Sequence, residues 1–178
     1  AGQLIALKLA QTEGGAQRPP ARLVQRIVER SQGNPFYIEE LLNYLRDRGL
    51  AQAEQMELPA SLHSLMLSRI DRLSERHKVT LKIASIPGRV VPLDWMDYHP
   101  ALGGVLAIAP DFEALTHGDL LEQTPDEPPG TTFQFKHVVT QEVAYESLAY
   151  ATRAELHEQL AQYLEQQPDE ARFLNLLA

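Results

Sequence analysis

The sequence contains no cysteine in its 178 residues. This absence excludes a disulfide framework, a thiolate nucleophile and a Cys-ligated zinc site, and it favours a reducing compartment such as the cytoplasm. No apolar run approaches the roughly 20 residues that cross a bilayer. The first residues also lack the charged and apolar regions of a signal peptide. We therefore expect a cytoplasmic globular protein of one or two domains, without a membrane partner.

Basic side chains are scarce in the second half of the chain. The net charge is −8, but residues 1–89 carry 13 basic and 9 acidic side chains, whereas residues 90–178 carry 3 and 15. No lysine or arginine lies between Arg89 and Lys136. Because cations that neutralise phosphates supply most of the affinity for DNA, this distribution disfavours nucleic acid as a partner.

Catalytic motifs are also missing. There is no G-x-x-x-x-G-K-[ST] loop to hold a triphosphate and no G-x-S-x-G elbow. The phrase beginning at His157 starts like a H-E-x-x-H zinc motif but has Ala161 where the second ligand must stand. The six histidines are scattered singly. We expect no catalytic residue, no metal site and no cofactor in this chain itself.

Helical periodicity dominates the first half. Pro19-Pro20 opens a helix that continues to about Ser31, and Gly33 suits the left-handed residue after a helix end. Asn34 is then an N-cap and Pro35 the first residue of the next helix, which closes at Gly49. We expect this turn to offer a flat proline face and free backbone N–H groups. The apolar face of the second helix comprises Ile38, Leu41, Leu42 and Leu45.

Further helices follow before the pattern changes. Helices are expected from Pro59 to Leu73, from the cap Ser74 to Pro87-Gly88, over 93–98, and from Pro110 to about His117. Two short strands, 120–123 and 132–135, form a hairpin around a Pro- and Gly-rich turn. Helices from 137 to 148 and from Thr152 complete the order. Several helices closed by one hairpin give the element order of a winged-helix domain.

Three phrases resemble the signatures of one family. Residues 31–42, SQGNPFYIEELL, are similar to GNP-[LF]-[FY]-[LI]-x-E-L. Residues 58–62 and 68–73 are similar to LP-x-SL … R-[IL]-D-x-L, and residues 135–157 to F-[RK]-H-x-[LV]-x-[QR]-x-x-Y-x-x-L … R-x-x-[LI]-H. These signatures belong to STAND-class signal-transduction ATPases, relatives of the AAA+ proteins that are joined to adenylate or guanylate cyclase or kinase modules in bacteria.

The resemblance implies a mainly α fragment in three parts. Residues 1–50 would be the helical lid of an ATPase module, residues 51–148 a winged-helix domain, and residues 149–178 a helical linker leading into TPR-like repeats. Both ends of the chain resemble cuts within helices, so we expect an upstream P-loop ATPase domain and downstream helical repeats as partners in the same chain. ATP or ADP with Mg would bind in the parent protein.

The resemblance also assigns residue roles. The turn Gly33-Asn34-Pro35 would lie against the base or ribose of the nucleotide, and His137 would contact the ADP phosphate, with Lys136 adding positive charge. Both phrases have a structural alternative, a helix connector for the turn and a capping or packing histidine for His137. The implied function is non-catalytic sensing of the ATP/ADP state. The alternative is a free-standing winged-helix domain of a transcriptional regulator that binds DNA or protein.

Overall fold

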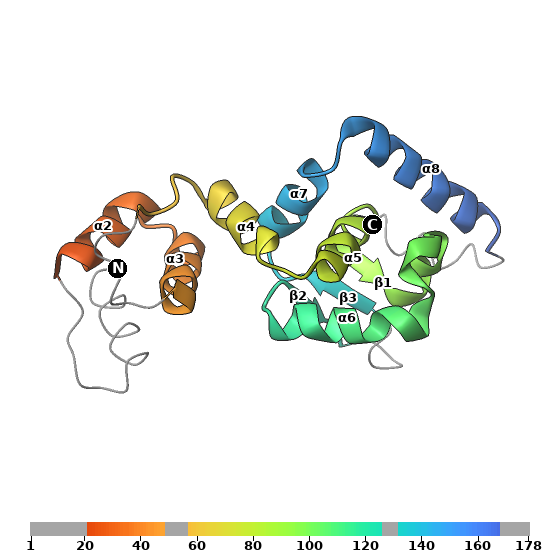
Figure 1. Cartoon of the computed structure of the whole chain (residues 1–178), viewed down its shortest axis with the longest axis horizontal. Helices are drawn as coiled ribbons and strands as arrows, with labels where there is room; N and C mark the ends of the chain where they lie inside the picture. Colours follow the sequence, from red (N-terminus) through yellow and green to blue (C-terminus); the bar gives the residue numbers. More distant parts are fainter. Residues whose placement is uncertain (1–20, 49–56, 126–131, 168–178) are drawn as a thin grey trace. The chain divides into compact units, whose positions relative to one another are not determined.

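The computed structural model describes residues 21–48, 57–125 and 132–167. The chain is mainly helical with a small antiparallel sheet, and it divides into two units, Ala1–Arg69 and Ile70–Ala178 (Figure 1). The predicted helix start at Pro19-Pro20, the stop at Gly49 and the expected repeat at 173–178 lie outside the described residues. No helix in the described part of the chain has the length and apolar character needed to cross a membrane.

The first unit contains two helices that pack against each other, α2 (Ala21–Ser31) and α3 (Pro35–Arg48). α2 buries Leu23 and Ile27, spaced one turn apart, as the helical period requires. The predicted apolar face of α3 is confirmed, since Ile38, Leu41, Leu42 and Leu45 are all buried.

Residues 57–61 lead into α4 (Leu62–Asp71). Ser61 caps this helix, because its Oγ accepts a hydrogen bond from the Ser64 N–H at 3.1 Å. Leu65 and Met66 on α4 are fully buried. The division between the two units falls inside this helix.

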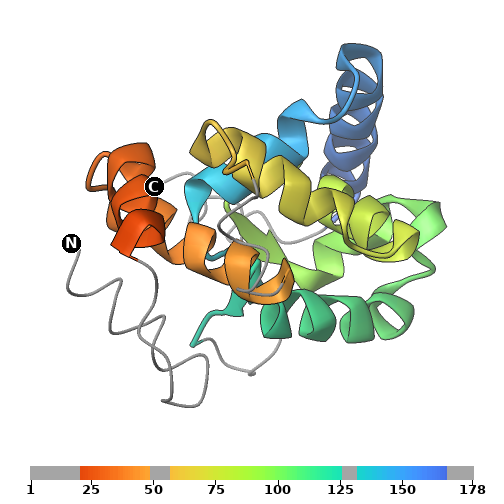
Figure 2. The same ribbon diagram turned by 60° about the vertical axis from the view of Figure 1, so that its left-hand side comes forward.

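The second unit begins with α5 (Glu75–Ala84), whose predicted cap is confirmed. Ser74 Oγ accepts a hydrogen bond from the His77 N–H at 3.2 Å. The predicted short helix over residues 93–98 is a 3-10 helix, η2 (Leu93–Tyr98). A second 3-10 helix, η3 (Pro100–Leu102), follows it. α6 (Val105–His117) then packs against α5 (Figures 1 and 2).

The start of α6 differs from the sequence prediction. Pro110 does not open this helix but lies inside it, five residues after its first residue. Instead, Gly103 and Gly104, with φ of 75° and 87°, turn the chain into the helix, and Asp97 Oδ1 accepts a hydrogen bond from the Val105 N–H at 3.0 Å. Glycine adopts these positive φ values without strain. The Asp97 carboxylate thus satisfies a backbone N–H at the start of α6.

The predicted hairpin is confirmed and has a third strand beside it. β2 (Leu121–Gln123) and β3 (Thr132–Phe135) pair antiparallel, and β1 (Val90–Pro92), which the sequence analysis missed, pairs with the other edge of β3. The strand order is therefore β1-β3-β2. Phe133 packs edge-on against Phe112 of α6, with ring centroids 5.0 Å apart, so one face of the sheet rests on that helix.

Two helices complete the second unit, α7 (Val138–Glu146) and α8 (Tyr150–Glu165). Gln141 Nε2 on α7 donates a hydrogen bond to the Ser85 carbonyl at the end of α5, at 2.8 Å. α8 packs on η2, where the Tyr163 hydroxyl donates to the Asp94 carbonyl at 2.9 Å. Leu156 and Leu160 form the buried stripe of α8.

Candidate functional site

The turn Gly33-Asn34-Pro35 has the backbone conformation that its sequence predicts. Gly33 has φ of 81°, Pro35 is the first residue of α3, and the Asn34 N–H donates to the Ser31 carbonyl at 2.9 Å. Gly33, Asn34 and Pro35 are all exposed. A Cβ at position 33 would meet no atom within 4 Å, so the positive φ, and not crowding, is the reason for glycine here.

The expectation of free N–H groups at this turn is wrong. Asn34 Oδ1 accepts hydrogen bonds from the Phe36 N–H at 3.0 Å and the Tyr37 N–H at 3.2 Å. The Ile38 N–H donates to the Asn34 carbonyl, and Pro35 has no N–H to offer. Asn34 is thus an N-cap that satisfies the start of α3 internally. What the turn presents outward is the proline ring.

Signature residues of the first unit contact one another. The Tyr37 hydroxyl donates a hydrogen bond to the Pro59 carbonyl at 2.7 Å. Glu40, which is buried, forms an ion pair with Arg69. The first two phrases that carry the family resemblance are therefore held together by two polar contacts, one to the segment before α4 and one to α4 itself. Burial raises the pKa of Tyr37, and the positive charge of Arg30 opposes that rise.

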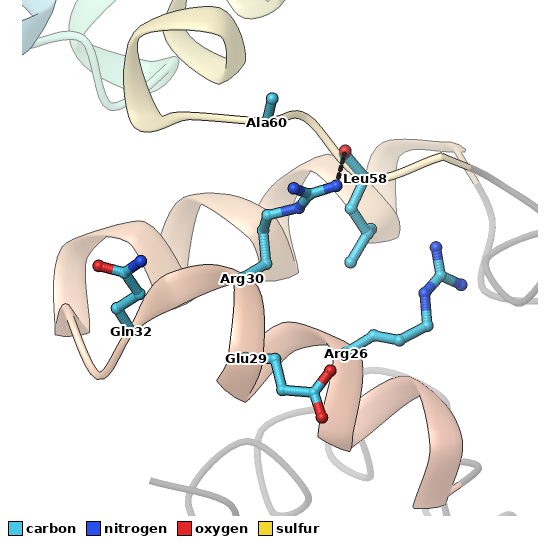
Figure 3. A pocket seen from close by; sticks show the side chains of 6 residues that line it. All are labelled: Arg26, Glu29, Arg30, Gln32, Leu58 and Ala60. Carbon is cyan, nitrogen blue, oxygen red and sulfur yellow. Dashed lines mark hydrogen bonds between the residues drawn. The ribbon is translucent and has the colours of Figure 1, made fainter.

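A hollow lies beside the turn, between α2 and the segment that precedes α4 (Figure 3). Its volume is about 320 Å³. The wall includes the Arg30 guanidinium, whose Nη2 donates to the Leu58 carbonyl at 3.4 Å. The described residues that line it are Arg26, Glu29, Arg30, Gln32, Leu58 and Ala60.

Lys136 and His137 link β3 to α7 in the second unit. The Lys136 Nζ donates to Asp119 Oδ1 at 2.6 Å, so a phosphate here would compete with that carboxylate. His137 is half-buried, and it caps α7 through its backbone carbonyl, which accepts from the Thr140 N–H at 3.0 Å. The ring itself is not used as the helix cap.

The signature residues that follow His137 form the joint between α7 and α8. The Tyr145 hydroxyl lies 3.1 Å from His157 Nε2, and the two rings meet edge-on with centroids 5.8 Å apart. The Arg153 guanidinium carbon lies 4.9 Å from the centre of the Tyr145 ring, within cation–π range. The spacing Y … R-x-x-L-H thus places three interacting side chains on two consecutive helices.

Sequence reasoning missed a polar cluster between α5 and α6. Asp111 is 5% exposed, and both of its oxygens accept from Arg76 Nε, at 2.8 and 2.9 Å. The Thr80 hydroxyl donates to Asp111 Oδ2 at 3.0 Å, and Arg76 Nη2 donates to the Ala107 carbonyl at 2.6 Å. The hydrogen bond and the charge of Asp111 raise the pKa of Arg76. No local pattern could reveal this cluster, because its partners are 31 and 35 residues apart in the sequence.

The predicted nucleotide-contacting residues belong to both units. Gly33, Asn34 and Pro35 lie in the first unit, and Lys136 and His137 lie in the second. Within residues 21–48, 57–125 and 132–167, no group of three or more His, Asp or Glu side chains is placed to hold a metal ion.

One family model matches part of the chain. It is described as a domain of unknown function, DUF8739, and it covers residues 4–58. The matched segment contains α2, α3 and the Gly33-Asn34-Pro35 turn, and it ends before α4 and the second unit. No curated protein and no solved structure matches the chain.

Proposed function

We propose that this chain is the regulatory, non-catalytic part of a multidomain signalling ATPase of the STAND class. Residues 1–50 act as the helical lid over a nucleotide, residues 51–148 act as a winged-helix domain, and residues 149–178 act as the helical linker. In the parent protein a P-loop domain binds ATP or ADP with Mg, and helical repeats of TPR type follow α8. A cyclase or kinase module is the expected output.

The contacts between signature residues carry this proposal. Tyr37 meets Pro59, and Glu40 pairs with Arg69, which joins two phrases of the resemblance. In the third phrase, Tyr145, Arg153 and His157 contact one another. A chance likeness of sequence gives no reason for these particular positions to meet. The sequence of helices followed by the β2–β3 hairpin supports the winged-helix part.

The resemblance to STAND ATPases supplies the mechanism of this proposal. In the ADP state, lid and winged helix close over the nucleotide, with Pro35 against the base or ribose and His137 at the phosphate. Exchange of ADP for ATP alters these contacts and shifts the equilibrium toward an open arrangement. The winged helix then moves as a rigid body and carries its neighbours with it.

The parent protein provides the test. His137→Ala should accelerate the release of a fluorescent ADP analogue several-fold and raise basal activity, because one phosphate contact is lost. His117→Ala is the matched control, since this exposed histidine at the end of α6 has no role in the proposed site. An unchanged ADP off-rate in the His137 variant would remove this residue from the site.

The isolated chain offers a second test. Without a P-loop, it should show no ATP turnover and at most weak ATP binding by calorimetry. Micromolar or tighter binding of ATP to these 178 residues would contradict the proposal that the main phosphate site belongs to another domain.

A further inference from the structure

The guanidinium of Arg153 has no acceptor within the part of the chain that the structure describes. Its Nε is shielded from solvent but donates no hydrogen bond, and no carboxylate of the described residues pairs with the group. Arg69 and Arg76, by contrast, each meet a carboxylate. Because buried polar groups in proteins are normally satisfied, an arginine without an acceptor indicates a place where an acceptor from another molecule can bind.

Two tyrosine rings hold this guanidinium in position. Its carbon lies 4.9 Å from the centre of the Tyr145 ring and 5.9 Å from the centre of the Tyr150 ring. Tyr145 is itself held by His157, whose Nε2 lies 3.1 Å from the tyrosine hydroxyl. Contacts with aromatic faces do not use the N–H donors of arginine. An incoming acceptor therefore meets a donor group whose position is already restricted, which lowers the entropic cost of binding.

The cluster is displayed on the surface where α7 meets α8. Tyr150 is 82% exposed, and His157 is exposed as well. Figures 1 and 2 both show this joint at an edge of the second unit, away from the three-stranded sheet. An exposed ring such as that of Tyr150 changes rotamer rapidly, so it can turn aside to admit a ligand to the Arg153 Nε. Tyrosine and arginine are also enriched at the energetic centres of protein–protein interfaces, so this composition favours a protein segment as the ligand.

The charges around Arg153 decide which anion fits. Glu155 and Glu158 follow Arg153 by two and five residues, so the helical period places them roughly 200° and 140° around α8 from it. A carboxylate with one negative charge matches the single guanidinium through two parallel N–H···O bonds. A phosphate dianion would keep an excess negative charge near the glutamates of this helix, so it fits less well.

We propose that the α7–α8 joint is a docking site for an acidic protein segment. Arg153 binds an aspartate or glutamate side chain of that segment, and the Tyr150 ring covers apolar surface beside it. Tyr145 and His157 are positioning residues that hold the guanidinium. The inference uses only α7 and α8, and it holds whether or not the chain responds to a nucleotide.

The experiment is an NMR titration of the full ¹⁵N-labelled chain, in which the Nε–H signal of Arg153 and the amides of α7 and α8 are followed. The Nε–H signal is assigned by its loss in Arg153→Lys. The probes are a blocked tripeptide with glutamate between two leucines, the same peptide with glutamine, sodium acetate and inorganic phosphate, all at constant ionic strength. The acidic peptide should give saturable shifts with a Kd on the order of tens of millimolar or tighter, because one charge-assisted pair supplies most of the affinity. The glutamine peptide should not saturate.

Three variants separate the contributions. Arg153→Gln should abolish the saturable shifts, and Arg153→Lys should weaken binding by about threefold to tenfold, because lysine keeps the charge but loses the bidentate geometry. Tyr150→Ala should weaken the acidic peptide about threefold but change acetate binding by less than about twofold, because acetate has little apolar surface to cover. Arg22→Gln is the matched control, since it removes the same charge from an exposed position in the first unit, and it should leave binding unchanged.

Several results would overturn the proposal. Shifts that rise linearly without saturation, or a loss of affinity in Arg22→Gln equal to that in Arg153→Gln, would show only general screening. Phosphate that binds more tightly than acetate would contradict the choice of a carboxylate. Acetate that binds as tightly as the acidic peptide would contradict the assignment to a protein segment. Circular dichroism checks that the helices of each variant are intact, and Tyr150→Ala, at an exposed position, keeps the test decisive if the Arg153 variants do not fold.

Discussion

Asp111 meets three polar groups of α5 while almost wholly removed from solvent. Arg76 and Thr80 donate to it, and His77 Nε2 lies 3.8 Å from its Oδ1. A buried carboxylate is tolerated only where such partners replace its hydration, so these contacts link α6 to α5 through Asp111. Arg76 itself is 60% exposed, which means that water weakens its share of the interaction.

Replacing this carboxylate tests its contribution. Asp111→Asn keeps the size of the side chain but removes its charge, and it places an amide group beside the Arg76 guanidinium. We expect the free energy of unfolding to fall by about 2 kcal/mol in urea titrations near neutral pH. Glu113→Gln, on the exposed side of the same helix, should change it by less than about 0.5 kcal/mol. Equal effects of the two variants would show that the cluster contributes little.

His99 gives the fold a pH dependence of its own. Burial lowers the pKa of His99 from its ordinary value of 6.5, and its Nδ1 accepts a hydrogen bond from the Ala101 N–H at 3.3 Å, which requires the unprotonated nitrogen. As the pH falls, the unfolded chain therefore takes up this proton before the folded chain does. Neutral His99 makes its full contribution to the free energy of unfolding above pH 6.5, and this contribution is lost as the pH falls through the lower pKa of the folded state.

His99→Asn separates this effect from the others. Asparagine can still cap η3, but it does not titrate. Between about pH 7 and about pH 5, the free energy of unfolding should fall more in the wild type than in the variant. Parallel pH profiles for the two proteins would contradict the assignment.

At the residue scale, the sequence predicts what depends on near neighbours. Asn34 and Ser74 were identified as caps because their hydrogen-bond partners lie two or three residues away. The Asp111 cluster and the Tyr145–His157 contact join residues that only the folded chain brings together. Asn34 illustrates the limit of this reasoning. The sequence predicts that Asn34 caps α3, but it does not predict that this cap occupies the N–H groups of the first turn and leaves none for a phosphate.

Among the elements, α6 is the one whose sequence conflicts most with its structure. Pro110 within the helix has no N–H to donate to the Leu106 carbonyl one turn earlier. The helix forms nonetheless because Ile108, Phe112 and Leu115 are buried on one face. Burial of that face outweighs the local preference of proline for a helix start.

Pro110→Ala should therefore stabilise the protein. Pro110 is exposed, and alanine restores the missing donor, so we expect the free energy of unfolding to rise by about 1–3 kcal/mol. Pro100→Ala is the control, because Pro100 begins η3, where the missing N–H does no harm. That variant should be neutral or less stable. A loss of stability on Pro110→Ala would mean that the proline positions the helix in a way that alanine cannot.

The elements that sequence reasoning missed or misplaced have physical reasons in common. β1 has three residues and ends in Pro92, so it carries no alternating pattern of its own. It exists because β3 offers a free edge, to which Val90 and Val91 pair. α3 and α5, by contrast, have strong local signals at their starts, and both were predicted within a residue of their first positions.

For the whole molecule, the distribution of charge decides which large partners are suitable. In the second unit, Arg76, Lys78 and Lys136 each form an ion pair with a carboxylate, and no lysine or arginine lies between Arg89 and Lys136. A DNA duplex would therefore meet acidic groups along α6 and β2. Few lysine or arginine side chains are available here to neutralise phosphates and release counterions, which is the main source of affinity for DNA.

Fluorescence anisotropy with a labelled duplex tests this at physiological salt. We expect no saturation at micromolar protein, and no steep dependence of any residual binding on salt concentration. Nanomolar affinity with a steep salt slope would overturn the argument and favour the transcriptional alternative. A single-stranded oligonucleotide in the same assay extends the test to RNA-like ligands.

The order β1-β3-β2 has a consequence for synthesis. Strand β3 lies in the middle of the sheet but is the last of the three to leave the ribosome. Val90 of β1 and Glu122 of β2 both pair with Gln134 of β3. Neither outer strand therefore has a partner until the chain has been synthesised to that residue. The second unit therefore cannot complete its sheet during the translation of its first half. A ribosome that stalls before the codon for Phe135 would leave the edges of β1 and β2 unpaired and exposed to chaperones and proteases.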